Sequence, residues 1–99
     1  METRDLILIE HVCVNHNIEF SFIDTLYEFG LIEVIIHEDH KYLAQEQLKD
    51  VEKMIRLHYE LDINMEGIDV ISNLLKRMNS LQQELIATQN RLRLFEGED

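Results

Sequence analysis

The fold is decided by residues 18–33, which read IEFSFIDTLYEFGLIE. Apolar side chains recur in this stretch at the spacing of one helix face, namely Phe20, Ile23, Leu26 and Tyr27. Gly30 follows them, and glycine is the residue best suited to cap the C-terminal end of a helix. The pattern therefore predicts a helix that begins at Phe20 and is capped by Gly30.

A shorter helix is predicted immediately before it. Ile9, Val12, Cys13 and His16 recur at helical spacing, and the polar Asn15-His16-Asn17 then interrupts the pattern. Asparagine tolerates the left-handed backbone conformation that a tight turn needs, so we expect the turn at Asn17. A helix, a tight turn and a second helix in this order indicate a helix-turn-helix.

The second helix of this motif has an unusual charge for a DNA reader. Residues 18–33 contain no lysine or arginine, whereas duplex DNA presents about one phosphate per 1.7 Å of its axis. A helix without cations cannot offset that charge. The motif therefore indicates a DNA-binding fold, and its charge indicates a different partner.

Residues 31–43 have the pattern of a small β-hairpin, or wing. Ile32, Val34 and Ile36 alternate with other residues, and a polar stretch then precedes Tyr42 and Leu43. An irregular loop is the alternative for so short a segment. Residues 44–61 return to helical spacing and predict a third helix, with apolar positions at Leu48, Val51, Ile55, Leu57 and Leu61.

A fourth helix is predicted from Asn64 almost to the end of the chain. Asn64 is placed to cap it, and Glu66 lies in its first turn, where the helix dipole favours a negative charge. Apolar residues follow at alternating steps of three and four, which is a coiled-coil seam with Thr88 as its one polar member. We call this set the seam: Ile71, Leu74, Met78, Leu81, Leu85, Thr88, Leu92 and Phe95.

The seam predicts contact with another chain, most simply a second copy in a homodimer. Its flanking charges leave the orientation open: Arg91 could meet Glu96 in a parallel pair, or Arg77 could meet Glu84 in an antiparallel pair. The expected organisation is a winged helix-turn-helix domain at residues 1–65 and a long C-terminal helix at residues 66–99. The fold class is mostly α-helical.

Composition narrows the class of partner. Twenty acidic and nine basic residues give a formal charge of −11, which disfavours nucleic acid and anionic membranes and favours a basic protein. No segment approaches the roughly 20 apolar residues of a membrane span. The single cysteine, Cys13, cannot form an internal disulfide, so we expect a cytoplasmic protein.

Neither catalysis nor metal binding is predicted. His37, Glu38, Asp39 and His40 are adjacent, but a structural zinc site usually needs four well-placed ligands and no second pair is near. The spacing of Cys13 points it into the core, where a thiol is ordinarily inert. Since no glycine-rich phosphate loop occurs either, we expect a protein without an enzymatic activity, a cofactor or a metal.

Two family resemblances follow from these motifs. The order of elements is that of MerR-type proteins, and Tyr27-Glu28-Phe29-Gly30-Leu31-Ile32 resembles the Tyr-Glu-x-x-Gly-Leu-Ile ending of their recognition helix, with one spacer residue fewer. The chain also resembles the chaperone-modulator CbpM family, small acidic proteins with a MerR-like domain. That resemblance rests on residues 9–31, on Arg56-Leu57-His58-Tyr59-Glu60-Leu61 with Gly67-Ile68, and on Leu81-Gln82-Gln83-Glu84-Leu85.

The CbpM resemblance implies an adaptor that binds the J domain of a CbpA-like cochaperone and blocks its action on a DnaK-type chaperone. J domains of this kind are similar in presenting a basic helix. The first 40 residues here contain nine acids and one basic residue, Arg4. Five of these acids are the expected partner-binding residues: Glu19, Asp24, Glu28, Glu38 and Asp39.

Two other functions compete with this one. A MerR-like transcriptional regulator could use Lys41, Lys49, Lys53 and Arg56 as a modest basic strip from wing to third helix, although its DNA binding would be weak and salt-sensitive. A scaffold that only self-assembles through the seam is the third possibility.

Overall fold

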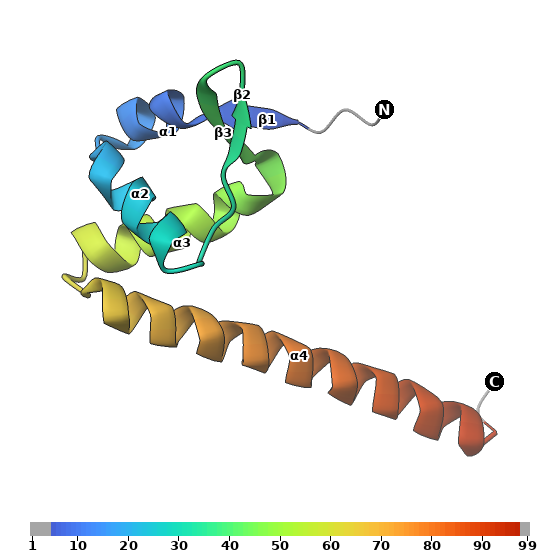
Figure 1. Ribbon diagram of the computed structural model, residues 1–99. Coiled ribbons are helices and arrows are strands. Elements are labelled where there is room, and N and C mark those ends of the chain that lie inside the picture. Colours follow the sequence, from blue (N-terminus) through green and yellow to red (C-terminus); the bar gives the residue numbers. More distant parts are fainter. Residues whose placement is uncertain (1–4, 98–99) are drawn as a thin grey trace. The chain divides into compact units, whose positions relative to one another are not determined.

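The computed structural model describes residues 5–97, so Glu2 and Arg4 of the acidic N-terminal segment lie outside the described residues. The chain divides into two compact units, Met1–Asp69 and Val70–Asp99. The predicted domain boundary after residue 65 stays a prediction. The elements follow the order β1 (Leu6–Leu8), α1 (Ile9–His16), α2 (Phe20–Glu28), β2 (Ile35–His37), β3 (His40–Ala44), a 3-10 turn (Gln45–Gln47), α3 (Leu48–Tyr59) and α4 (Met65–Phe95) (Figure 1).

Helices α1 and α2 end in the same way, through one residue in the left-handed conformation. Asn17 has φ 55° and follows α1, and Ile18 N–H donates back to the Cys13 carbonyl at 3.0 Å. Gly30 has φ 75° after α2, and Leu31 N–H donates to the Leu26 carbonyl at 3.0 Å. These bonds satisfy carbonyls that a helix end leaves open. The predicted turn at Asn17 and the cap at Gly30 are confirmed.

The buried face of α2 differs from the predicted one. Ile23 and Leu26 are buried as expected, but the third buried residue is Phe22, while Phe20 and Tyr27 are exposed. The reason lies in α3, because the Phe22 ring stacks on His58 with ring centroids 5.0 Å apart and meets Tyr59 edge-on at 5.3 Å. These partners draw Phe22 inward, which turns Phe20 outward.

The wing belongs to a three-stranded antiparallel sheet rather than to an isolated hairpin. The strand order is β1-β3-β2, with Leu6 opposite Ala44 and Ile35 opposite Tyr42. Figure 1 labels the three strands. Strand β1 was not predicted, although Leu6-Ile7-Leu8 is an apolar run of the right length. Its pairing places Leu43 of the central strand in the core, where it is fully buried.

The wing strands and α3 are both shorter than predicted. Gln47 explains why β2 starts later than predicted. Its side-chain amide accepts a hydrogen bond from Glu33 N–H and donates one to the Glu33 carbonyl, both at 2.9 Å. These bonds occupy the backbone of Glu33, so β2 begins only at Ile35. Ala44 still belongs to β3, and the chain passes through the 3-10 turn before α3 begins at Leu48.

The core of the first unit includes the beginning of α4. Asn64 caps this helix, because its Oδ1 accepts a hydrogen bond from Gly67 N–H at 2.8 Å, which confirms the predicted cap. Just before it, the Ile63 carbonyl accepts a hydrogen bond from His58 Nδ1 at 2.9 Å. Ile68, in the first turn of α4, is fully buried. It belongs to the core, whose other members are Ile9, Val12, Cys13, Phe22, Ile23, Leu26, Ile32, Leu43, Val51, Met54 and Ile55.

Candidate protein-binding surface

The outward face of α2 combines aromatic and acidic side chains. Phe20, Ser21, Asp24, Tyr27 and Glu28 are all exposed on it. The opposite face is held in the core by buried side chains, and the Gly30 turn fixes its end. Asp24 and Glu28 are one helical turn apart and therefore share a face. The helix that would read DNA in this motif thus presents two carboxylates and no cation.

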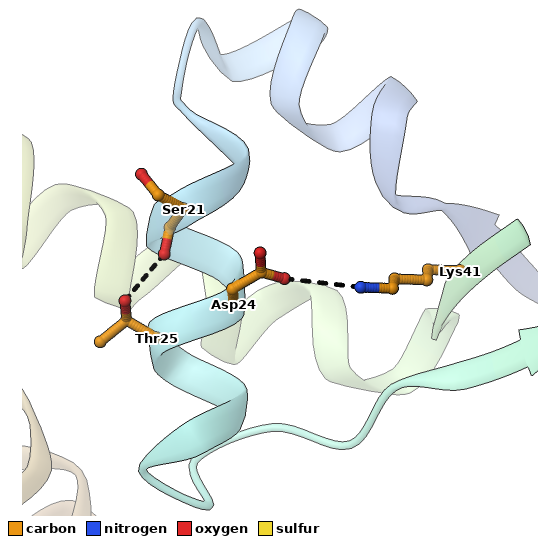
Figure 2. A network of polar contacts seen from close by, with 4 residues as sticks. All are labelled: Ser21, Asp24, Thr25 and Lys41. Atoms are coloured by element: carbon orange, nitrogen blue, oxygen red, sulfur yellow. Dashed lines mark hydrogen bonds and ion pairs between the residues drawn. The ribbon is translucent and has the colours of Figure 1, made fainter.

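Lys41 of β3 reaches across to this face. Its Nζ lies 3.8 Å from Asp24 Oδ1, and Figure 2 shows the pair lying between α2 and the wing. Both side chains are half-exposed, and such pairs contribute only about 0–1 kcal/mol to stability. Within the helix, Thr25 Oγ1 donates to the Ser21 carbonyl at 2.8 Å (Figure 2). Asp24 is therefore partly neutralised, whereas the neighbouring Glu28 adds its full charge.

Glu19 lies apart from the other candidate acids. It precedes α2, its side chain makes no capping bond, and its carboxylate accepts a hydrogen bond from Ser21 Oγ at 3.1 Å. Its backbone N–H points to the Tyr59 hydroxyl of α3 at 3.4 Å. Glu19 is thus placed near the junction of α2 and α3.

The wing tip carries the remaining two acids in a strained turn. Glu38 and Asp39 connect β2 to β3 and have φ values of 51° and 68°. Two consecutive positive values define the tight hairpin turn that normally uses Asn-Gly, because side chains with a Cβ are disfavoured there. The turn holds both carboxylates exposed at the end of the wing.

A groove opens beside Phe20, with a volume of about 200 Å³. Four elements (β1, α1, α2 and β3) and the wing turn contribute to it through Leu8, Ile9, Glu10, Phe20, Asp39, His40 and Lys41. A second, wider groove of about 620 Å³ lies along α1 and shares Glu10 and Phe20 with the first. Its other lining residues are His11, Cys13, Val14, Asn17 and Ile18. We call the two together the Phe20 groove.

The Phe20 groove contains one predicted site residue, Asp39, and several that sequence reasoning missed. Glu10, Val14 and Phe20 are exposed and line it. The helical spacing of the sequence places Phe20 on one apolar face with Ile23. Its position as the first residue of α2 is a signal against burial with that face, since the first turn of a helix favours acidic or capping residues.

Comparison with known protein families bears directly on this arrangement. The model of the MerR HTH family regulatory proteins matches residues 7–90, which covers the helix-turn-helix, the wing, α3 and most of α4. The chain belongs to the MerR HTH family. No curated protein matches it significantly.

Family membership agrees with the fold of this MerR-family chain. Helix-turn-helix, wing, α3 and long α4 are the predicted elements, and the mostly helical fold class is confirmed. Proteins of the family are typically non-catalytic. Among residues 5–97, no helix is long and apolar enough to cross a membrane.

The basic residues of this MerR-family chain lie mainly on α3 and α4. Lys49, Lys53 and Arg56 are exposed on α3 at steps of four and three, so they share one face. Lys41, the fourth member of the predicted basic strip, is paired with Asp24 instead. The strip is therefore reduced to three cations on one helix.

Helix α4 carries the seam on a single, continuous helix that ends at Phe95. Leu74, Met78, Leu81, Leu85, Leu92 and Phe95 are all exposed, each with about half or more of its surface open to water. Leu75 and Ile86 are also exposed and widen the apolar face. The charges considered for parallel and antiparallel pairing, including Arg77 and Arg91, are carried by the same helix.

Cys13 occupies the predicted position in the core. It is buried, and burial raises the pKa of its thiol, with a smaller contribution from the negative charge of Asp24. Both effects disfavour the reactive thiolate. Among the residues described, no three histidine, cysteine or acidic side chains come together in a way that could hold a metal ion.

Proposed function

We propose that this MerR-family protein is a non-enzymatic modulator that binds the J domain of a CbpA-like cochaperone and blocks its action on a DnaK-type chaperone in the cytoplasm. The observation that carries the proposal is the outward face of α2, where Asp24 and Glu28 replace the cations that DNA would require. The resemblance of residues 56–61 and 67–68 to the CbpM family supports the same partner.

Electrostatics supports a basic protein as the ligand. The chain has a net charge of −11, and a field of one sign steers an oppositely charged partner, raising association rates by about 10–10³-fold. Such steering contributes more to rate and specificity than to affinity. A basic J-domain helix bound to α2 would be unable to contact its chaperone.

The association rate with a purified J domain tests this proposal. We expect Asp24→Lys with Glu28→Lys to slow association at least about tenfold, because both changes reverse the field at the contact. Lys41→Gln should speed association, since it removes the cation that partly neutralises Asp24.

Raising the salt concentration should weaken binding of the wild type, as exposed charges are screened over about 8 Å at physiological ionic strength.

A control variant separates the α2 face from net charge alone. Glu60→Lys with Glu96→Lys changes the total charge equally at two exposed positions, which lie just after α3 and α4. It should slow association much less than the α2 variant. An unaltered rate in a folded Asp24→Lys, Glu28→Lys protein would move the contact away from α2, and a wild type that does not bind the J domain would contradict the proposed function itself.

The proposal includes a homodimer. A second copy is the simplest partner for the seam, because an exposed apolar stripe of this length on one helix is unfavourable in water. Each dimer would then offer two copies of the acidic α2 face.

Transcriptional regulation is the second candidate, because the matching family model describes regulatory proteins and α3 presents Lys49, Lys53 and Arg56 together. We expect no gel shift of random or genomic DNA at micromolar protein and physiological salt. Three cations among a large acidic excess give only weak binding that salt abolishes. A sequence-selective shift that survives physiological salt would favour the regulator over the chaperone modulator.

A further inference from the structure

We propose that the Phe20 groove is a docking site for a basic amphipathic helix, which inserts an apolar side chain beside Phe20 and places its cations against Glu10 and Asp39. The inference rests on the proposed function, because it specifies where and how the J-domain helix would bind. It places the centre of the contact at the groove rather than on the acids of α2 alone.

The position of Phe20 supports a role outside the core. Phe20 is 46% exposed, because it lies two residues before the buried Phe22 and therefore on the opposite side of α2. Phe20 begins α2, where the helix dipole favours acidic side chains and gives no advantage to an uncharged ring. The first turn of α2 contains no acidic residue. Half-exposed aromatic side chains that border a pocket are typical anchors of protein interfaces.

The shape of the groove, a narrow pocket that continues into a wider and longer part, suits a side chain inserted from a helix. The part between Phe20 and the wing holds about 200 Å³, below the roughly 300–1,000 Å³ of small-molecule sites, so it suits a single inserted side chain. The second part continues along α1 past Val14, which is exposed. Apolar side chains such as Phe20 and Val14 thus alternate with polar ones along the groove, and such a surface can receive side chains spaced along one face of an amphipathic helix.

The charges around the groove select a basic occupant. Glu10 is shared by both parts, and the strained turn at the wing tip holds Asp39 at the edge of the first part. Lys41 also lines the groove, but its charge is offset by Asp24 at 3.8 Å. Two carboxylates and one neutralised cation attract a lysine- or arginine-rich helix and repel phosphate.

Calorimetric titration of the 99-residue chain with the J domain tests the groove. We expect Phe20→Ala to raise the Kd at least about tenfold, as removal of an aromatic anchor commonly does. Phe29→Ala is the matched control, because Phe29 is an exposed phenylalanine just after α2 that lines neither part of the groove and is not among the residues of the outward α2 face. It should change the Kd less than about threefold, within the spread of near-neutral interface positions. Circular dichroism confirms that both variants are folded.

The outcomes separate the groove from the proposed function. If the wild type binds the J domain and Phe20→Ala binds equally well, or both variants lose affinity equally, the groove is not the docking site although the modulator role stands. If the wild type does not bind the J domain, a synthetic amphipathic peptide of leucine and lysine replaces it. Amide chemical-shift changes centred on Glu10, Phe20 and Asp39 then support the groove, whereas changes confined to α4, or none, overturn it.

Discussion

Replacing Leu85 and Leu92 with aspartate is expected to halve the mass of the protein measured by light scattering. Both side chains are more than half exposed on α4 and occupy equivalent positions of the seam. Burying a leucine in a helix pair gains about 1.5–3 kcal/mol, and an aspartate at the same position loses that gain and must also be desolvated. Two such changes in each copy exceed what a short coiled coil can tolerate.

The opposite face of α4 provides the control for this result. Gln83→Asp with Asn90→Asp adds the same charge two residues before each seam position, on the polar side of the helix, and should leave the mass unchanged. Equal masses for the wild type and the Leu85→Asp, Leu92→Asp variant would mean that the seam is not a self-association surface. Helical content measured by circular dichroism shows whether either variant unfolds.

The substitution Leu26→Ala is expected to have the largest effect on stability. Leu26 is completely buried in α2, and its carbonyl also accepts the bond from Leu31 N–H that ends the helix. Removing a buried leucine side chain costs about 2–5 kcal/mol. A loss of about 3 kcal/mol lowers the Tm of a domain of this size by about 12–24 °C.

Leu61→Ala is the matched control for the core substitution. It deletes the same atoms from a leucine that is 64% exposed after α3, so its cost should stay within about 0.5 kcal/mol. Thermal unfolding followed by circular dichroism measures both variants. A Tm for Leu26→Ala within a few degrees of the wild type would mean that α2 is not anchored through this residue.

The sequence predicted those parts of the fold that depend on neighbours along the chain. The caps at Asn17, Gly30 and Asn64 are determined by residue type and backbone conformation within one turn, and all three occur as expected. The exposed Phe20 and the buried Phe22 could not be distinguished in this way. Both are aromatic, and each lies at helical spacing from a buried residue of α2, Phe20 from Ile23 and Phe22 from Leu26. Which of the two is buried depends on ring contacts with His58 and Tyr59, which follow Phe22 by more than thirty residues.

Long-range pairing also explains the unpredicted parts of the sheet and the site. Strand β1 exists because Leu6 pairs with Ala44, and local pattern cannot reveal such a partner. The acidic character of the site was clear from composition, but the pair between Asp24 and Lys41 joins two separate elements. The Phe20 groove requires β1, both helices and the wing to be assembled before its lining can be recognised.

The buried thiol of Cys13 gives the protein an intrinsic reporter of local opening. As the only cysteine of this sequence, it is the target of a thiol-specific label, and its buried side chain, carried by α1, borders the wider part of the Phe20 groove. Because Cys13 is buried and burial raises the pKa of its thiol, a label reacts slowly until local opening exposes the sulfur to water. The labelling rate therefore measures the free energy of that opening, and a ligand that closes the groove would slow it.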